Sequence, residues 1–361
     1  MSQMRSKLVQ KILFLSLFIL ASTFAITEAY AYTISDDATG GDCSTIGTWD
    51  SASKTCTLSG DLTEGIIIGS SYITLDGNGH SITGNNPQYN DGEIFEVFGI
   101  YVDTKVNVVI QDVSVFDFYN GIVLANSVNS IIQDSYFTHN KSVQISIGNS
   151  DDTVVSNNIV ACDSTSIGIL ADGNRNEVSG NTVTACRDTG MHISGENVIV
   201  SNNVIDDDGT NYEHAHGLKV YGDYAIIDGN TVKNYHDGLF YSGSEYGTIK
   251  NNIISGNDNI GLYFNWGKNT VIDNTVSNNG IGLNIGTNGN TVYHNNLISN
   301  TKEGQGVGNY LVNLSQSNDL GGNYWSDYSL NCSDSNHDNF CDDSYPLKDI
   351  VKLNDDLIWT V

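Results

Sequence analysis

Apolar and polar residues alternate in short runs along most of the chain, and the pattern of runs repeats about nine times between Ile94 and Ile298. Each repeat of about 22 residues holds two or three runs, separated by Gly, Asn, Asp or Ser. Alternation with a period of two is typical of β-strands, and the separating residues favour tight turns. The sequence therefore predicts short strands joined by turns rather than helices.

Two columns of residues recur with the same spacing. One is a glycine followed by an apolar residue, and its glycines are Gly99, Gly121, Gly168, Gly190, Gly217, Gly238, Gly261 and Gly282. The other is a turn asparagine, found at Asn158, Asn181, Asn203, Asn230, Asn252, Asn274 and Asn296. Asparagine tolerates the left-handed backbone conformation, and its amide can bond to an amide stacked above it. Two columns in step indicate one structural unit that is stacked many times.

A unit of this length with three short strands is too small to bury a core alone. It suits one coil of a parallel β-helix, in which each strand pairs with its equivalent in the next coil. A leucine-rich repeat has a similar period, but its Leu-x-x-Leu-x-Leu frame is absent from this sequence. We therefore predict an all-β fold, a single-stranded right-handed parallel β-helix (solenoid) of about ten coils with N- and C-terminal caps.

The two ends of the chain differ from the repeats. Residues 1–31 have the pattern of a secretory signal peptide, with basic residues before an apolar run and a small-x-small site that predicts cleavage after Ala31. An uncleaved anchor is the alternative, and no later segment is apolar enough to span a membrane. We assign 32–57 to an N-terminal cap, 58–300 to the parallel β-helix and 301–361 to a C-terminal cap.

Charge and cysteine content place the chain outside the cytoplasm. It carries 15 Lys and Arg against 42 Asp and Glu, a net charge of −27, which disfavours binding to nucleic acid. We expect a secreted, extracellular or cell-envelope (periplasmic) protein. Six cysteines in an exported chain imply three disulfides, although six allow fifteen pairings. Proximity and coil spacing favour the pairs Cys43 with Cys56, Cys162 with Cys186, and Cys332 with Cys341.

Two terminal motifs add a family resemblance. Residues 75–80 read Leu-Asp-Gly-Asn-Gly-His, and residues 322–328 read Gly-Asn-Tyr-Trp-Ser-Asp-Tyr. Together with the coils, over roughly 58–346, they resemble the right-handed parallel β-helix repeat proteins of NosD type and, more distantly, the pectate-lyase-like enzymes. The resemblance implies the fold. It leaves the function open, because such proteins include lyases, epimerases, hydrolases, surface-binding modules and a copper accessory protein.

The candidate site lies on an outward strand face. The residue after each glycine should point inward and the next one outward, so equivalent residues of successive coils form vertical ladders. Across three consecutive coils this places titratable side chains on one patch, namely Asp188, His192, His216, Lys219, Tyr221, His236 and Asp237. An acidic insertion at 206–213 is expected to lean over the same face, and long insertions beside titratable groups often mark a binding site.

The residue types in this patch suit chemistry on a uronic acid. Inverting or cleaving such a sugar at C5 requires a cation for its carboxylate, a base for the C5 proton and an acid. Lys219 could neutralise the carboxylate, and His216, oriented by Asp237, could be the base. Tyr221 or His192 could then be the acid.

Other residues widen the range of sugar chemistry at this face. Asp188 and Asp237 could instead be the two carboxylates of a glycoside hydrolase. His236 could contact the substrate, and Phe240 and Tyr263 could stack on a sugar ring. We predict a protein that binds an extracellular polysaccharide or cell-envelope glycan, with uronan lyase or C5-epimerase activity if it is an enzyme. A non-catalytic structural surface protein, whose outward ladder is only a solvated face, is an alternative.

A transition-metal site is the second alternative for the same patch. His214 and His216, with His236 or His192, could bind copper or zinc through imidazole nitrogen, consistent with the NosD resemblance. Methionine, the soft ligand expected for reduced copper, is scarce, since Met191 is the only one beyond the signal.

A calcium loop is predicted near the C-terminus. Oxygen-bearing residues at alternate positions match the start of an EF-hand-like loop, and the ligands would be Asp334, Asn336, Asp338, the carbonyl of Phe340, and Asp342. The loop departs from that pattern at Asn339 and Tyr345. A calcium ion there would stabilise the cap, and a plain solvated acidic turn is the other interpretation.

Overall fold

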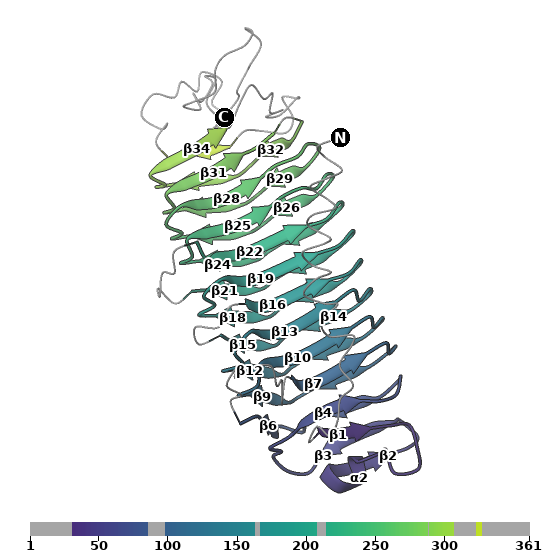
Figure 1. The fold of residues 1–361 in the computed structure, drawn as a ribbon. Helices are drawn as coiled ribbons and strands as arrows, with labels where there is room; N and C mark the ends of the chain where they lie inside the picture. The colour runs from purple at the N-terminus through teal and green to yellow at the C-terminus, as the bar shows by residue number, and fades with distance from the viewer. Residues whose placement is uncertain are drawn as a thin grey trace, which may run out of the picture. The chain divides into compact units, whose positions relative to one another are not determined.

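The chain forms three parallel β-sheets that wind around a common core (Figure 1), and the computed structural model describes residues 31–85, 98–162, 167–207, 214–287, 289–306 and 323–326. Successive strands of each sheet are about one coil apart in sequence, so every coil contributes one strand to each sheet. This arrangement confirms the prediction of an all-β, right-handed parallel β-helix of about ten coils.

Sheet A holds the longest strands and carries the candidate site. In order along the sheet its strands are β1 (Ala31–Ile34), β4 (Gly65–Ile68), β7 (Phe98–Asp103), β10 (Asn120–Ala125), β13 (Val143–Gly148), β16 (Ile167–Asp172), β19 (Thr189–Ser194), β22 (His216–Tyr221), β25 (Asp237–Tyr241), β28 (Ile260–Phe264), β31 (Ile281–Ile285) and β34 (Lys302–Gly306).

Sheets B and C are built from shorter strands. Sheet B contains β2 (Gly47–Asp50), β3 (Thr55–Leu58), β5 (Thr74–Asp76), β8 (Val109–Gln111), β11 (Ile131–Gln133), β14 (Val154–Ser156), β17 (Glu177–Ser179), β20 (Ile199–Ser201), β23 (Ile226–Asp228), β26 (Thr248–Lys250), β29 (Thr270–Ile272) and β32 (Thr291–Tyr293). Sheet C contains β6 (Ser81–Thr83), β9 (Ser114–Phe116), β12 (Tyr136–Thr138), β15 (Ile159–Ala161), β18 (Thr182–Thr184), β21 (Val204–Asp206), β24 (Thr231–Lys233), β27 (Ile253–Ser255), β30 (Thr275–Ser277), β33 (Asn296–Ile298) and β35 (Tyr324–Trp325).

The core is a set of stacked apolar columns inside the coils. In sheet A the residue after each glycine is buried and pairs with its equivalent one coil away, as Ile169 does with Met191 and Met191 with Leu218. In sheets B and C the middle residue of most strands is the buried one. Because side chains alternate between the two faces of a strand, the residue after each core position in sheet A faces outward, whereas the glycine before it is buried and a Cβ there would meet core side chains.

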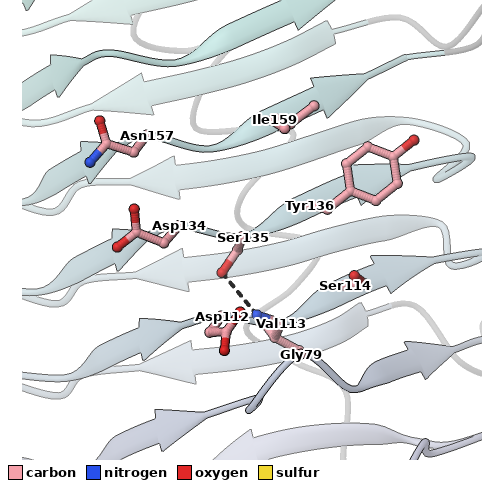
Figure 2. Close-up of a pocket in the computed structure, with 9 residues that line it drawn as sticks. All are labelled: Gly79, Asp112, Val113, Ser114, Asp134, Ser135, Tyr136, Asn157 and Ile159. Atoms are coloured by element: carbon pink, nitrogen blue, oxygen red, sulfur yellow. Dashed lines mark hydrogen bonds between the residues drawn. The ribbon is translucent and has the colours of Figure 1, made fainter.

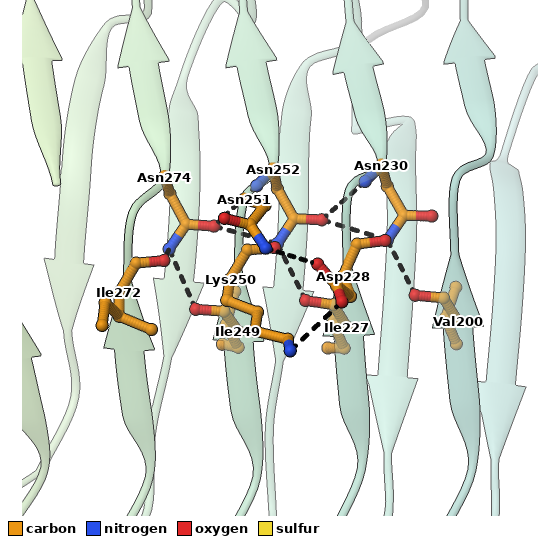
Figure 3. A network of polar contacts seen from close by, with 10 residues as sticks. All are labelled: Val200, Ile227, Asp228, Asn230, Ile249, Lys250, Asn251, Asn252, Ile272 and Asn274. Carbon is orange, nitrogen blue, oxygen red and sulfur yellow. Dashed lines mark hydrogen bonds and ion pairs between the residues drawn. The ribbon is translucent and has the colours of Figure 1, made fainter.

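A ladder of buried asparagines stabilises the turn between sheets B and C (Figure 3). The Oδ1 of Asn252 accepts the backbone N–H and the Nδ2 of Asn230, at 2.9 and 3.0 Å, and its own Nδ2 donates to the backbone oxygen of Ile227 at 2.9 Å. The same bonds recur through Asn158, Asn181, Asn203, Asn230, Asn252, Asn274, Asn295 and Asn323. The prediction of Asn296 as a member was wrong, since Asn295 takes that place and Asn296 begins β33.

The stacked strands extend beyond the predicted limits of 58–300. At the start, β1 pairs with β4, so sheet A begins at Ala31 within the region assigned to the signal and the cap. The antiparallel pair β2–β3 and the short helix α2 (Cys43–Ile46) follow it. At the other end, β34 pairs with β31, and β35 pairs with β33.

Two predicted disulfides are present. Cys43 and Cys56 are joined with their Cα atoms 5.8 Å apart, and Cys162 and Cys186 are joined at 4.8 Å, which is the spacing of adjacent coils. The remaining predictions for the two ends of the chain concern residues that the structure does not describe. These are the signal peptide, the bond between Cys332 and Cys341, and the calcium loop at Asp334, Asn336, Asp338, Phe340 and Asp342. Within the described residues, no helix is long and apolar enough to cross a membrane.

Candidate functional site

The predicted vertical ladders are present on the outer face of sheet A. His192 of β19 pairs with Lys219 of β22, and Lys219 pairs with Phe240 of β25. In a neighbouring column, His216 pairs with Asp237. We call the outward cluster formed by His192, His216, Lys219, Tyr221 and Asp237 the histidine–lysine patch. Residues far apart in the sequence therefore meet on three consecutive coils, as the repeat predicted.

His216 and Asp237 face each other across two coils. The Nδ1 of His216 lies 3.5 Å from the Oδ2 of Asp237, and this buried nitrogen has no hydrogen-bond partner among the described residues. The other oxygen of Asp237 is fixed, because it accepts from the Nδ2 of Asn259 at 2.9 Å and from the backbone N–H of Ile260 at 3.2 Å. Asp237 is thus held beside an imidazole that could hydrogen-bond to it after a small shift.

Burial and mutual repulsion disfavour the charged forms of the basic groups in the patch. Burial lowers the pKa of His216 to about 3, with Lys219 adding to the effect, and lowers the pKa of His192 to about 4 with the same help from Lys219. Burial also lowers the pKa of Lys219 itself, although Asp188 and Asp237 oppose that shift. Both imidazoles are therefore neutral near pH 7, which is the protonation state that a general base requires.

Aromatic rings surround the patch. The His192 and Tyr221 rings lie 5.3 Å apart, and burial raises the pKa of the Tyr221 hydroxyl, so that it stays protonated and can donate. Phe240 and Tyr263 stack on each other at 4.5 Å with an angle of 17° between their planes. One face of each ring is therefore occupied by the other, and a sugar cannot insert between them.

The structure places the remaining sugar-site residues at the edge of the patch. Asp188 is exposed in the turn before β19, and its backbone oxygen accepts from the N–H of His216 at 2.8 Å. His236 occupies the equivalent turn before β25. Asp188 and Asp237 lie two coils apart, or about 9.6 Å along the stack. Of the predicted acidic insertion at 206–213, Asp206 ends β21 in sheet C and Asp207 is buried, whereas residues 208–213 lie outside the described residues.

The proposed metal ligands do not assemble into a copper or zinc centre in the described part of the chain. The His214 and His236 rings make an edge contact at 5.5 Å, but no group of three or more His, Cys, Asp or Glu side chains is placed to hold a metal ion among these residues. Met191 points into the core and is fully buried. A transition-metal site usually needs three or four convergent donors, so the described residues do not fit such an ion.

A shallow hollow lies elsewhere on the solenoid, over β9, β12 and β15 (Figure 2). It has a volume of about 360 Å³. Its lining residues are Gly79, Asp112, Val113, Ser114, Asp134, Ser135, Tyr136, Asn157 and Ile159, and none of them belongs to the patch. The hollow and the histidine–lysine patch are thus separate features of the surface.

Sequence reasoning missed a pair of tyrosines at the turn between sheets A and B. Tyr224 follows β22 and Tyr246 follows β25, and their rings stack at 5.0 Å with only 5° between the planes. Both residues have φ of 61° and are about half exposed. A left-handed backbone costs an L-residue roughly 1–2 kcal/mol, whereas an aromatic pair contributes about 0.5–1.5 kcal/mol. The stack alone does not offset two strained residues.

Comparison with known proteins establishes the family. A family model described as periplasmic copper-binding protein (NosD) matches residues 46–221 and, in an overlapping second match, residues 194–330. The chain belongs to the NosD family. A comparison with curated proteins found no match.

This NosD-family chain is similar to several solved structures, and it shares its fold with one of them, a tailspike protein. The Dettilon tailspike protein is 14% identical with a TM-score of 0.54, over 75% of this chain and 59% of the tailspike. The chain thus spans less than two thirds of that protein's length. The A-module of the Azotobacter vinelandii mannuronan C-5 epimerase AlgE4 is 15% identical with a TM-score of 0.41, over 72% of this chain and 86% of the module. The pectate lyase Pel9A is 14% identical with a TM-score of 0.39, over 85% of this chain and 82% of the lyase.

Proposed function

We propose that this NosD-family protein binds an acidic polysaccharide of the uronan type at the histidine–lysine patch. The observation that carries the proposal is the gathering of Lys219, His192 and His216 on one partly buried strand face of a chain whose net charge is −27. Burial lowers the pKa of all three groups, and Lys219 adds to the effect on both imidazoles; an arriving carboxylate opposes these shifts because it favours the charged forms. The patch is therefore suited to a sugar carboxylate.

The same geometry supports proton transfer at the bound sugar. Lys219 would hold the carboxylate and stabilise negative charge as the C5 proton leaves. His216 would accept that proton, and the fixed carboxylate of Asp237 would stabilise the resulting imidazolium. Tyr221, whose hydroxyl stays protonated, would donate a proton to the leaving oxygen or to the opposite face. These roles support a lyase or C5-epimerase more directly than a glycoside hydrolase.

The family and the disulfides support a location outside the cytoplasm. The matching family is described as periplasmic, and disulfides persist in oxidising compartments such as the periplasm and the extracellular space. We propose that the protein is located in the cell envelope or outside the cell.

Replacing Lys219 by glutamine should weaken binding of polyuronates by roughly tenfold to a hundredfold, because a charge-assisted hydrogen bond to the carboxylate is lost. Calorimetric titration with polymannuronate or polygalacturonate measures this affinity. The matched control is Lys233→Gln on sheet C, because the ammonium of Lys233 lies 2.9 Å from Asp206 and outside the patch.

Turnover is followed through the absorbance of an unsaturated product and through the C5 composition of the polymer, and His216→Gln should abolish this turnover.

The titration also decides between the proposal and its alternatives. If the wild-type protein binds no acidic glycan, the proposal is overturned. In that case copper retained after dialysis would favour the metal-binding function in the family's description, with His214, His216 and His236 as the first residues to replace. If the protein neither binds an acidic glycan nor retains copper, the remaining alternative is a structural surface protein.

Acidification below pH 6.5 should destabilise the wild-type protein more than a His216→Gln variant. The pKa of His216 is about 3 in the folded chain and near 6.5 in the unfolded chain. Between these two pH values the unfolded state binds more protons than the folded state, so the free energy of unfolding decreases as the pH is lowered. Thermal unfolding at pH 7 and pH 5 measures the difference. Equal losses of Tm in both proteins would contradict the lowered pKa.

A further inference from the structure

The turn between sheets A and B carries a column of exposed side chains beside the patch. Equivalent residues of successive coils follow one another there with positive φ, and the column reads Asn107, Asn129, Asp152, Arg175, Asn197, Tyr224, Tyr246 and Lys268. Most members are the short or polar residues that such a turn favours. The two tyrosines stand out, because bulky aromatic residues are strained in this conformation and gain only partial compensation from stacking on each other.

The tyrosine stack is covered at one end and open at the other. At the covered end, the ammonium of Lys268 lies 4.7 Å from the centre of the Tyr246 ring and 2.8 Å from a carboxylate oxygen of Glu245. At the open end, the coil before Tyr224 places Asn197 in the column, and this short residue is exposed. Beyond it, the guanidinium of Arg175 is held by Asp152 at 2.6 Å.

Among the described residues, no aromatic ring or cation is stacked on the outer face of Tyr224, and the step over Asn197 is one coil high. Coils are about 4.8 Å apart, which is close to the 5.0 Å between the stacked tyrosine rings. A ring that entered this step would extend the stack by one member and cover the outer face of Tyr224. A pyranose presents an apolar face of C–H groups that suits an aromatic face, and its hydroxyls can reach the polar residues around the turn.

The open step lies next to the patch along the chain. Tyr221 ends β22 within the patch, and Tyr224 is three residues further on. The two later coils also carry aromatic residues on this strand and turn, although at other positions: Phe240 and Tyr263 follow Lys219 in its column, and Trp266 stands two residues before Lys268. Aromatic residues thus continue from the outer face of sheet A around the corner of the solenoid.

We propose that the exposed face of Tyr224 is a second sugar-binding subsite, which stacks on one ring of the acidic polysaccharide held at the patch. This inference rests on the proposed function, and it specifies the direction in which the bound glycan crosses the solenoid. The chain would run across the end of sheet A from Lys219 toward the turn, at right angles to the axis of the solenoid. Longer oligosaccharides would therefore bind more tightly than short ones.

The test compares short and long oligouronates on the wild type and on Tyr224→Asn. Asparagine suits this turn, so the variant should fold as the wild type does. We expect it to lose roughly tenfold in affinity for long oligomers and to retain its affinity for short ones, since one stacking contact is removed. Tyr72→Asn is the matched control, because Tyr72 has φ of 65° and is 55% exposed in the equivalent turn of an early coil, far from the patch.

Each outcome of this comparison decides the subsite. Equal affinities of the wild type and Tyr224→Asn at every length would overturn it, as would the same loss in Tyr72→Asn. If the wild type binds no oligouronate, the proposed function fails first. The subsite is then judged separately by titrating neutral oligosaccharides and recording the near-ultraviolet circular dichroism of the tyrosine pair. If neutral oligosaccharides give no circular dichroism signal that depends on Tyr224, the subsite is refuted. If they give such a signal, the subsite is retained as a site for a neutral sugar.

Discussion

Replacing Asn252 by alanine should lower the free energy of unfolding by about 3–5 kcal/mol, because several buried polar groups lose their partners at once. The side chain accepts from the backbone N–H and Nδ2 of Asn230, and it donates to the backbone oxygens of Ile227 and Lys250 and to Oδ1 of Asn274. Water cannot replace these bonds inside the coil. Urea denaturation followed by circular dichroism measures the loss.

The matched control is the next residue in the chain. Asn251 is exposed, and its side chain donates to Asp228 on the surface, as Figure 3 shows. Its φ of 55° resembles the 68° of Gly229 at the equivalent position one coil earlier, so Asn251→Gly keeps a suitable backbone. We expect a change within about 0.5 kcal/mol. Similar losses in both variants would mean that the buried ladder contributes no more than a surface contact.

Gly195→Ala should be at least as damaging, with a loss of more than about 4 kcal/mol or no folded protein. Gly195 has φ of 138°, and a Cβ there would lie 1.9 Å from the backbone oxygen of Gly173 in the preceding coil. That oxygen belongs to the stacked backbone and cannot move away without separating the coils. The residue directly follows β19, so the distortion would also disturb His192.

Soluble yield and thermal unfolding measure the effect of this substitution. Gly60→Ala is the control, because no atom lies within 4 Å of its added Cβ and its backbone is not left-handed. It should leave the Tm unchanged or raise it slightly, since alanine restricts the unfolded chain. A folded Gly195→Ala protein with the Tm of the wild type would show that the coils can separate locally at little cost.

The vertical alignment of the patch was predictable because strand alternation and repeat length together determine which residues become neighbours. Apolar residues after each glycine must face the core, and this alone turns His192 and Lys219 outward. Once the strands pair one coil apart, His216 must lie beside Asp237. Lengthening one turn does not alter that result, since the register is set by the strands on both sides of it.

Other features depended on information that the repeat does not hold. Asn295 and Asn296 are adjacent and chemically identical, and only the hydrogen bonds of the turn decide which one joins the ladder. The first strand, β1, lacks the glycine marker and begins within the segment that was predicted to be a signal peptide. The Tyr224 and Tyr246 stack was missed because these turns differ in length, so the two residues do not stand at a constant distance from the glycine of their coil.

The turn between sheets C and A tolerates unequal lengths of chain. Four residues separate β18 from β19, whereas nine separate β21 from β22, and the strands on either side still pair in register. Segments grafted into this connection would therefore emerge beside the same outward face without altering the scaffold that presents it. Ligand specificity could be exchanged between such solenoids, or designed anew, by replacing this one connecting segment while the strand pairing of every coil is preserved.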